Sequence, residues 1–253
     1  MKLLKQWAMV CLASIALLSG CSTTTDPADT FKGETAEHIF HQGEIALRKG
    51  NYRECIKRFE ALEVQYPYDK NSELAQLHII YAYYMSEDYP SAESAADRFI
   101  QLHPVSRYTD YAYYLRGVAN YYQNLGVYER LFAIDLSTRD LEQIKKSWSD
   151  FAAIAQQFPK SRYAAAARQY MIHLRNLMAK HIYGVAEFYY KRGAYVAAAN
   201  RANEVVQGYQ GAPVVPDALV LMVKSYRAMH LTQSADSTMR ILKYNYPAVA
   251  KRL

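Results

Sequence analysis

The sequence predicts an all-α protein, built as an α-solenoid of about five antiparallel helix pairs with an insertion in the third repeat. Apolar residues recur at helical spacing through almost every segment after residue 33, and no segment shows the alternation typical of strands. A short motif ending in proline recurs along the chain, first at Pro67 and again at Pro104, 37 residues later. Together these observations favour stacked helical repeats over a coiled coil, because the turns recur too often for one.

Residues 1–20 have the layout of a secretory signal peptide. Two lysines precede an apolar stretch from Trp7 to Leu18, which is shorter than the roughly 20 residues needed to cross a bilayer. Small residues then stand directly before Cys21. This arrangement resembles the lipobox of bacterial lipoproteins, so Cys21 is the predicted lipidation site and the mature N-terminus. The alternative is a soluble secreted protein in which Cys21 is incidental.

The mature chain divides into a linker and a folded region. Residues 21–33 are polar and lack periodicity after the cysteine, which predicts a lipidated N-terminus followed by a flexible linker. Residues 34–253 carry the repeats and form the predicted solenoid. That length is sufficient for a large core.

The first repeat predicts two helices joined by a tight turn. Residues 34–49 form the first helix and end at Gly50, which can adopt the left-handed conformation that closes a helix. Residues 52–65 form the second helix and stop before Pro67, which cannot continue it.

The repeated positions resemble the tetratricopeptide repeat. In the first unit these are Gly43, Gly50, Tyr52, Cys55, Phe59, Leu62 and Pro67, where small, turn, aromatic and proline positions are expected. The later units retain subsets: Tyr83, Tyr89, Ala92, Phe99 and Pro104; Gly117, Phe151, Ile154 and Pro159; Gly193, Tyr195 and Ala198; and Tyr226, Ala235 and Pro247. The third unit is interrupted between its helices by an insertion at about residues 124–140.

Composition excludes several classes of protein. The net charge is +6, but the basic residues are interspersed with acidic ones, so nucleic-acid binding is not expected. After removal of the signal and lipidation of Cys21, only Cys55 is left as a thiol, and we expect it to pack as a small apolar residue.

No motif in the sequence predicts catalysis, a metal site or a cofactor. A glycine-rich phosphate loop, a nucleophile elbow and a zinc-protease motif are all missing from the sequence. His38 and His41 have a spacing that can hold a metal, but no third ligand is evident, so two exposed histidines are the better interpretation. We therefore expect a membrane-tethered interaction scaffold.

The whole chain resembles one family, the BamD (ComL) lipoproteins of the outer-membrane β-barrel assembly machinery. The resemblance rests on motifs at residues 61–68, 80–84, 97–104, 113–117 and 185–197, and on the interrupted third repeat. It implies a non-catalytic lipoprotein that binds a BamA-type barrel insertase, other Bam lipoproteins and unfolded outer-membrane β-barrel proteins. Because residue 22 is serine and not aspartate, the resemblance implies an outer-membrane address with a lipid anchor, facing the periplasm.

The resemblance also implies a substrate site in the first repeats. Arg53, Tyr66 and Tyr68 are its candidates for gripping a strand-like segment. Aromatic faces would hold apolar side chains, and the arginine could bond backbone carbonyls or a terminal carboxylate. Residues 69–71 depart from the glycine-proline turn common in the family. The alternative role for the two tyrosines is packing between repeats.

A second site is implied in the carboxy-terminal half. Arg201 stands at the position of the family's interface arginine, on the side that faces BamA. The alternative is that Arg201 is an exposed helix residue without a binding role. In the insertion, Asp135, Ser137, Arg139 and Asp140 match the family's charged loop and are further partner-binding candidates, although Leu141 replaces the usual proline.

Two other functions remain open from the residues. One is a tetratricopeptide pilotin-type lipoprotein for secretin or pilus assembly, although regular 34-residue units would be expected there. The other is a cell-wall enzyme or its docking adaptor, and the missing catalytic constellation argues against the enzyme.

Overall fold

The computed structural model describes residues 26, 29–123, 140–251 and 253, and within these residues the chain forms helices and no strands. The predicted all-α solenoid is confirmed. Cys21 and most of the predicted insertion, including Asp135, Ser137 and Arg139, lie outside the described residues. None of the described helices combines the length and apolarity needed to cross a membrane.

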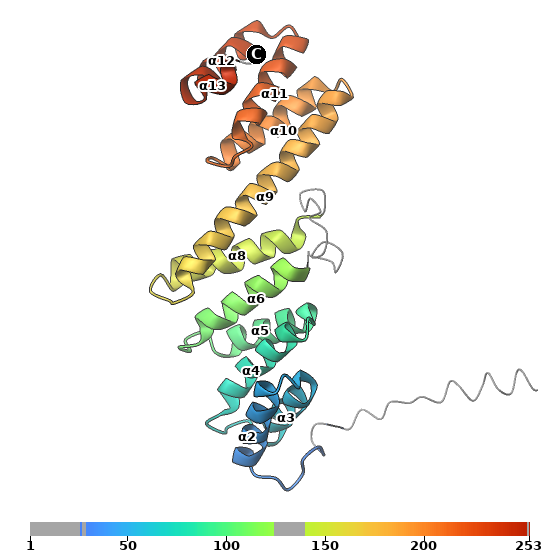
Figure 1. Ribbon diagram of the computed structural model, residues 1–253, viewed down its shortest axis with the longest axis vertical. Helices are drawn as coiled ribbons and strands as arrows, with labels where there is room; N and C mark the ends of the chain where they lie inside the picture. Colours follow the sequence, from blue (N-terminus) through green and yellow to red (C-terminus); the bar gives the residue numbers. More distant parts are fainter. Residues whose placement is uncertain (1–25, 27–28, 124–139, 252) are drawn as a thin grey trace, which may run out of the picture.

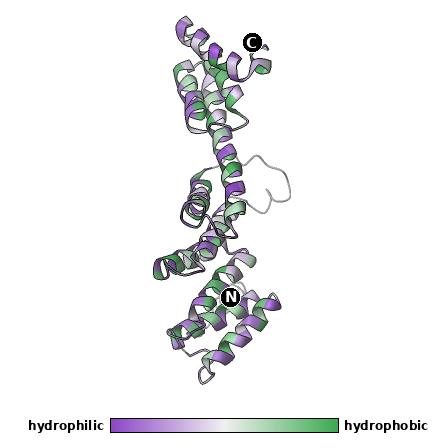
Figure 2. Cartoon of the chain, turned by 90° about the vertical axis from the view of Figure 1, so that its left-hand side faces the viewer, coloured by the Kyte–Doolittle hydropathy of each residue, from purple (hydrophilic) through white to green (hydrophobic). Residues whose placement is uncertain are grey.

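The helices stack as consecutive pairs into an elongated molecule (Figure 1). The pairs are α2 (Ala36–Arg48) with α3 (Tyr52–Gln65), α4 (Ser72–Met85) with α5 (Tyr89–Leu102), α6 (Thr109–Gln123) with α8 (Glu142–Gln157), α9 (Ala164–Lys191) with α10 (Tyr195–Gly208), and α11 (Val215–Ala228) with α12 (Thr232–Asn245). A short helix, α13 (Pro247–Ala250), follows the last pair. Hydrophilic and hydrophobic residues are interspersed along the helices, as expected for helices that bury one face (Figure 2).

The turn inside each of four pairs uses one left-handed residue. Gly50 and Gly193 occupy this position with φ of 72° and 76°. Glu87 and His230 occupy the equivalent position in two other pairs, with φ of 63° and 59°. A side chain there is strained, because the left-handed region brings Cβ close to the backbone. The predicted glycine turns are therefore present, and two repeats adopt them without glycine.

The second helix of each pair ends at an aromatic residue. Its backbone N–H donates to the carbonyl four residues earlier, and its φ and ψ lie outside the helical region. The five residues are Tyr66, His103, Phe158, Tyr209 and Tyr246. Proline follows four of them, and it disfavours helical backbone in the preceding residue. Tyr66 thus holds a structural position that the repeat reuses.

Small residues allow the paired helices to approach closely. A Cβ on Gly43 would lie 2.6 Å from the Phe59 ring, and one on Gly117 would lie 3.0 Å from the Phe151 ring. Both rings are fully buried. Cys55 is buried beside Phe59 as a free thiol, and burial raises its pKa to about 12. It packs as an inert apolar residue, as predicted.

Helix α9 is twice the usual length and links two parts of the solenoid. Its 28 residues pack against α8 on one side and against α10 and α11 further along (Figure 1). Leu174 and Met178 belong to a core shared with α6 and α8, whereas Ala179 and Ile182 belong to a core shared with α10 and α11. The change of core therefore falls in the middle of one continuous helix.

A buried polar network joins the second and third pairs. The Arg116 guanidinium donates to Asp150 at 2.5 and 2.9 Å and also pairs with Asp97. The Asn120 amide donates to the second Asp150 oxygen at 3.1 Å. Burial raises the pKa of Asp150, which is 3% exposed, while Arg116 opposes that rise. The carboxylate is thus stabilised by charge-assisted hydrogen bonds.

The described end of the predicted linker is packed against the first pair. Thr30 is buried, and its carbonyl accepts a hydrogen bond of 2.5 Å from the Gln65 amide. The Phe31 ring lies 4.1 Å from the Arg58 guanidinium. The sequence predicts a flexible segment up to residue 33, but these contacts attach residues 30 and 31 to α3. The polar composition of this segment does not predict these contacts, because they depend on one aromatic ring and one backbone carbonyl.

Candidate binding surfaces

A groove with a volume of about 630 Å³ follows the first helices of the first four pairs. It is lined by apolar, aromatic and arginine side chains. They come from α2 (Leu47), α4 (Leu74, Leu77, His78 and Tyr81), α6 with the loop before it (Arg107, Tyr108, Asp110 and Tyr111), and the loop before α9 (Arg162 and Tyr163). Ligand sites commonly have this apolar and aromatic character with a few polar groups.

Stacked tyrosines form one wall of the groove. Tyr163 stacks on Tyr111 and on Tyr114, with ring centroids 5.3 and 4.9 Å apart. Burial raises the pKa of Tyr111, so its hydroxyl stays protonated and can donate a hydrogen bond. Aromatic rings held by one another lose little conformational freedom on binding. This wall is therefore suited to hold apolar side chains of an extended segment.

Two arginines supply positive charge to the groove. Arg107 and Arg162 are exposed, and each guanidinium lies over the neighbouring tyrosine ring, at 4.5 and 5.1 Å from its centroid. Neither has a carboxylate partner in the part of the chain that the structure describes. Burial lowers the pKa of His78, so this lining residue is neutral. The free charges therefore favour an anionic or carbonyl-rich ligand.

The three predicted substrate residues do not converge on this groove. Arg53 is exposed in the first turn of α3, whereas Tyr66 and Tyr68 follow the other end of that helix. The 14 residues of α3 make it about 20 Å long. The Tyr66 hydroxyl donates to the Glu34 carbonyl at 2.7 Å, and its ring packs on the first core. Tyr68 is 99% exposed. Their substrate role stays a prediction, and the contacts of Tyr66 are those of packing.

The arginines and tyrosines of the groove belong to a repeated tripeptide, which is a sequence signal for this surface. Ser-Arg-Tyr occurs at residues 106–108 and again at 161–163. In both copies the serine hydroxyl accepts from the tyrosine N–H at 3.0 Å, which orients the arginine and tyrosine alike. Each copy of the tripeptide lies in the loop before the first helix of a pair. The repeat is recognised from the proline that ends the second helix of a pair, so the search for repeats does not identify the tripeptide.

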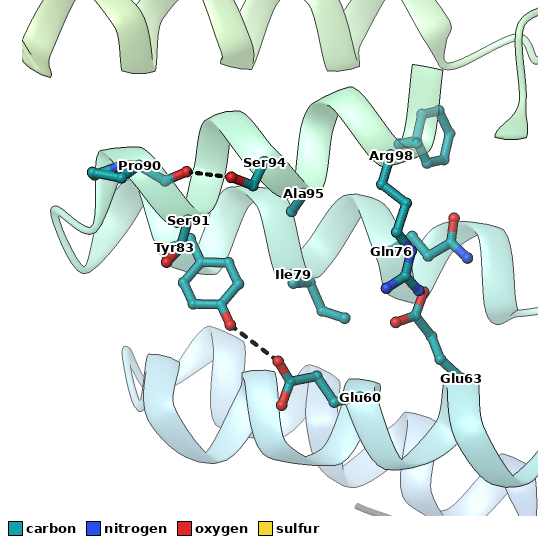
Figure 3. Close-up of a pocket in the computed structure, with 11 residues that line it drawn as sticks. Glu60, Glu63, Gln76, Ile79, Tyr83, Pro90, Ser91, Ser94, Ala95 and Arg98 are labelled. Atoms are coloured by element: carbon teal, nitrogen blue, oxygen red, sulfur yellow. Dashed lines mark hydrogen bonds and ion pairs between the residues drawn. The ribbon is translucent and has the colours of Figure 1, made fainter. Parts of the chain in front are cut away.

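A second cavity, of about 420 Å³, lies between α3, α4 and α5 (Figure 3). Its polar groups largely satisfy one another: the Tyr83 hydroxyl donates to Glu60 at 3.0 Å, and Arg98 pairs with Glu63 at 2.9 Å. Burial raises the pKa of Glu63, and Arg98 opposes that rise. Because its charged groups are partnered from within, this cavity offers fewer free contacts than the groove.

Two residues of the predicted carboxy-terminal site, Asp140 and Arg201, lie on one surface between α8, α9 and α10. A cavity of about 330 Å³ is lined by both Asp140 and Arg201, together with Leu141, His181 and Tyr209 among others. Arg201 pairs with Glu204 at 2.7 Å and keeps 52% of its side chain exposed. The Asp140 carboxylate accepts from the Glu142 N–H at 3.1 Å, at the start of α8. The fold thus brings together two candidates that lie about 60 residues apart in sequence.

The chain is similar in sequence to known proteins along most of its length. The family model described as "YfiO: Outer membrane lipoprotein" matches residues 32–241. Proteins named outer membrane protein assembly factor BamD are similar over most of their length. The protein from Neisseria meningitidis serogroup B is 34% identical over 91% of this chain and 87% of its own. The Xylella fastidiosa (strain Temecula1) protein is 33% identical over 94% and 81%. The Vibrio cholerae protein is 31% identical over 92% and 96%.

The family match covers the four helix pairs that line the groove and the surface around Arg201. It begins at residue 32, directly after the Phe31 ring that contacts α3. The solenoid and both surfaces are thus parts of one homologous unit, and the chain belongs to the BamD family of outer membrane lipoproteins.

Proposed function

We propose that this chain is a non-catalytic outer-membrane protein assembly factor, anchored by lipid at Cys21 on the periplasmic side of the outer membrane. The family match and the names of the relatives support this role. Two separate binding surfaces on one solenoid suit a scaffold, because each can hold a different partner at a fixed separation. No cofactor is part of the proposal.

The substrate partner is an unfolded β-barrel protein, and its site is the aromatic groove. The observation that carries this assignment is the stacked tyrosine wall beside Arg107 and Arg162. A strand-like segment presents alternate apolar side chains to the rings and backbone carbonyls to the arginines. Arg53 and Tyr68 lie outside the groove lining, so they are secondary candidates in this proposal.

The second partner is the barrel insertase of the BamA type, bound on the surface that contains Arg201 and Asp140. Arginine is common among residues that dominate binding energy, and Arg201 has an exposed guanidinium between two adjoining cavities. Asp135, Ser137 and Arg139, which lie outside the described residues, stay further candidates for binding the same partner. Other lipoproteins of the assembly machinery are further expected partners.

Co-purification of the native lipidated protein from detergent-solubilised outer membranes tests the proposed function. We expect a β-barrel insertase among the recovered proteins. Recovery of a secretin without an insertase would instead support the pilotin function.

The groove assignment is tested by crosslinking to unfolded barrel proteins. We expect the double variant Arg107→Glu, Arg162→Glu to reduce crosslinking at least about tenfold, since each lost charged contact costs about 1.5–3 kcal/mol. The control is Arg227→Glu, an exposed arginine on α11. Equal crosslinking by both variants would contradict the groove assignment.

A further inference from the structure

Three exposed cations lie on the first helix pair, spaced four residues apart. Lys49 directly follows α2, and Arg53 and Lys57 share one face of α3. None of the three forms an ion pair within the described part of the chain. We call these three residues the basic face.

The acidic residues near the basic face are already paired. Arg58 binds Glu54 at 2.7 Å and Glu34 at 3.4 Å, and Lys32 binds Asp29 at 3.3 Å. The basic face therefore presents net positive charge to its surroundings. Helix α3 packs on α2 and α4, which leaves its outward face available.

The amino-terminal segment reaches the solenoid beside the basic face. The Phe31 ring lies 5.5 Å from the Lys57 ammonium and 4.1 Å from the Arg58 guanidinium. The Thr30 carbonyl is held by Gln65 at 2.5 Å. These contacts fix where the chain from the lipid attachment site joins the fold.

The short chain from Cys21 limits how far the basic face can be from the membrane. Asp29 follows Cys21 by only about eight residues, and a fully extended chain of that length spans at most about 29 Å. A lipid on Cys21 therefore keeps Asp29 within about 29 Å of the headgroups, so that α3 can reach them. Each lysine or arginine near anionic headgroups increases the affinity of a protein for the membrane by about fivefold.

We propose that the basic face rests on anionic phospholipid headgroups of the leaflet that holds the lipid anchor. This inference depends on the proposed lipidation of Cys21, and it adds a second contact that orients the solenoid on the membrane. Under this assignment Arg53 contacts lipid and not substrate. Phe31 serves as the fixed link between the anchor chain and the basic face.

Lysine acetylation of the native lipidated protein in vesicles tests the proposal. The protein is reconstituted in phosphatidylcholine vesicles with or without phosphatidylglycerol, and acetylation rates are read by mass spectrometry. We expect phosphatidylglycerol to slow modification of Lys49 and Lys57 at least about fivefold, and added salt at roughly 0.5 M to restore it, because salt screens the attraction. Lys224 and Lys243, exposed on α11 and α12, are internal controls and should not change.

A charge-reversal variant provides the second arm. Arg53→Glu should remove the protection of Lys49 and Lys57, whereas Arg240→Glu on α12 should leave it intact. Equal acetylation on both kinds of vesicle would overturn the proposal. Protection that requires added insertase and no anionic lipid would overturn it too, and would assign the basic face to a protein partner.

The test separates this proposal from the lipid anchor on which it depends. Retention of the protein on pure phosphatidylcholine vesicles reports the anchor alone, since those vesicles carry no net charge. Loss of retention there would refute lipidation. Retention without lysine protection on anionic vesicles would refute only the basic face.

Discussion

Single residues in this solenoid are constrained by the repeat as much as by their neighbours. Tyr66 illustrates this, because the equivalent position is aromatic at the end of all five described pairs. Its hydroxyl bonds a backbone carbonyl and its ring joins a core. A tyrosine that looks suited to binding can therefore be explained by packing, whereas Tyr68 two residues later is 99% exposed.

The left-handed turn positions predict a stabilising substitution. His230→Gly should raise the free energy of unfolding by about 0.5–1 kcal/mol, because it relieves a non-glycine residue at φ 59°. Thermal or urea unfolding measures the change. The opposite control is Gly193→Ala at φ 76°, which should destabilise by a similar amount. A loss of stability in His230→Gly would mean that its side chain contributes more than the backbone strain costs.

The buried network predicts a large effect at Arg116. Arg116→Ala should lower the free energy of unfolding by about 3–5 kcal/mol, because the 3% exposed Asp150 would be left without its cation. Lys32→Ala breaks an ion pair whose side chains are 79% and 66% exposed, and should cost less than about 1 kcal/mol. Chemical denaturation compares the two. Similar losses in both variants would show that Asp150 is satisfied without Arg116.

Helical elements decide which residues share a surface. The start of α8 places Asp140 in the lining of the same cavity as Arg201 of α10, although neither the repeat nor the spacing indicates that the two are near each other. Conversely, α3 separates Arg53 from Tyr66 and Tyr68, since all three belong to one helix and its ends. A helix of 14 residues is about 20 Å long, so residues at its two ends cannot contact the same side chain of a ligand.

The surface on α10 predicts a specific loss of partner binding. Arg201→Glu should weaken insertase association about 30-fold or more, as expected for an arginine worth about 2 kcal/mol or more at an interface. Helical content should be unchanged, because the side chain is half exposed and pairs with Glu204 on its own helix. Pull-down and circular dichroism measure the two effects. Arg240→Glu on α12 is the control. A melted fold would assign Arg201 a structural role.

The whole molecule combines two groups of helix pairs through α9. Contacts join mainly consecutive helices, so stability in such solenoids is nearly a sum of local terms. The core that contains Phe59 and the core that contains Leu219 share no residues. A substitution that destabilises one core should therefore leave the stability of the other core unchanged.

Hydrogen exchange tests this independence. Phe59→Ala, which removes a fully buried ring at a cost of about 3–5 kcal/mol, should speed exchange in α2 to α4 and leave α11 and α12 unchanged. Leu219→Ala should show the reverse pattern. Faster exchange throughout the chain in either variant would mean that α9 couples the two groups into one cooperative unit.

The sequence by itself determined the helix pairs, their turns and the buried thiol, because these depend on local chemistry: glycine or a strained substitute at the turn, an aromatic residue before proline, and small residues opposite Phe59 and Phe151. Only the tertiary structure decided the surfaces. The groove joins side chains from three pairs and from the loop before a fourth, Asp140 and Arg201 line one cavity, and Phe31 attaches the amino-terminal segment to α3. Such contacts depend on how pairs stack and where α9 continues, and no local pattern encodes the position of one pair relative to another.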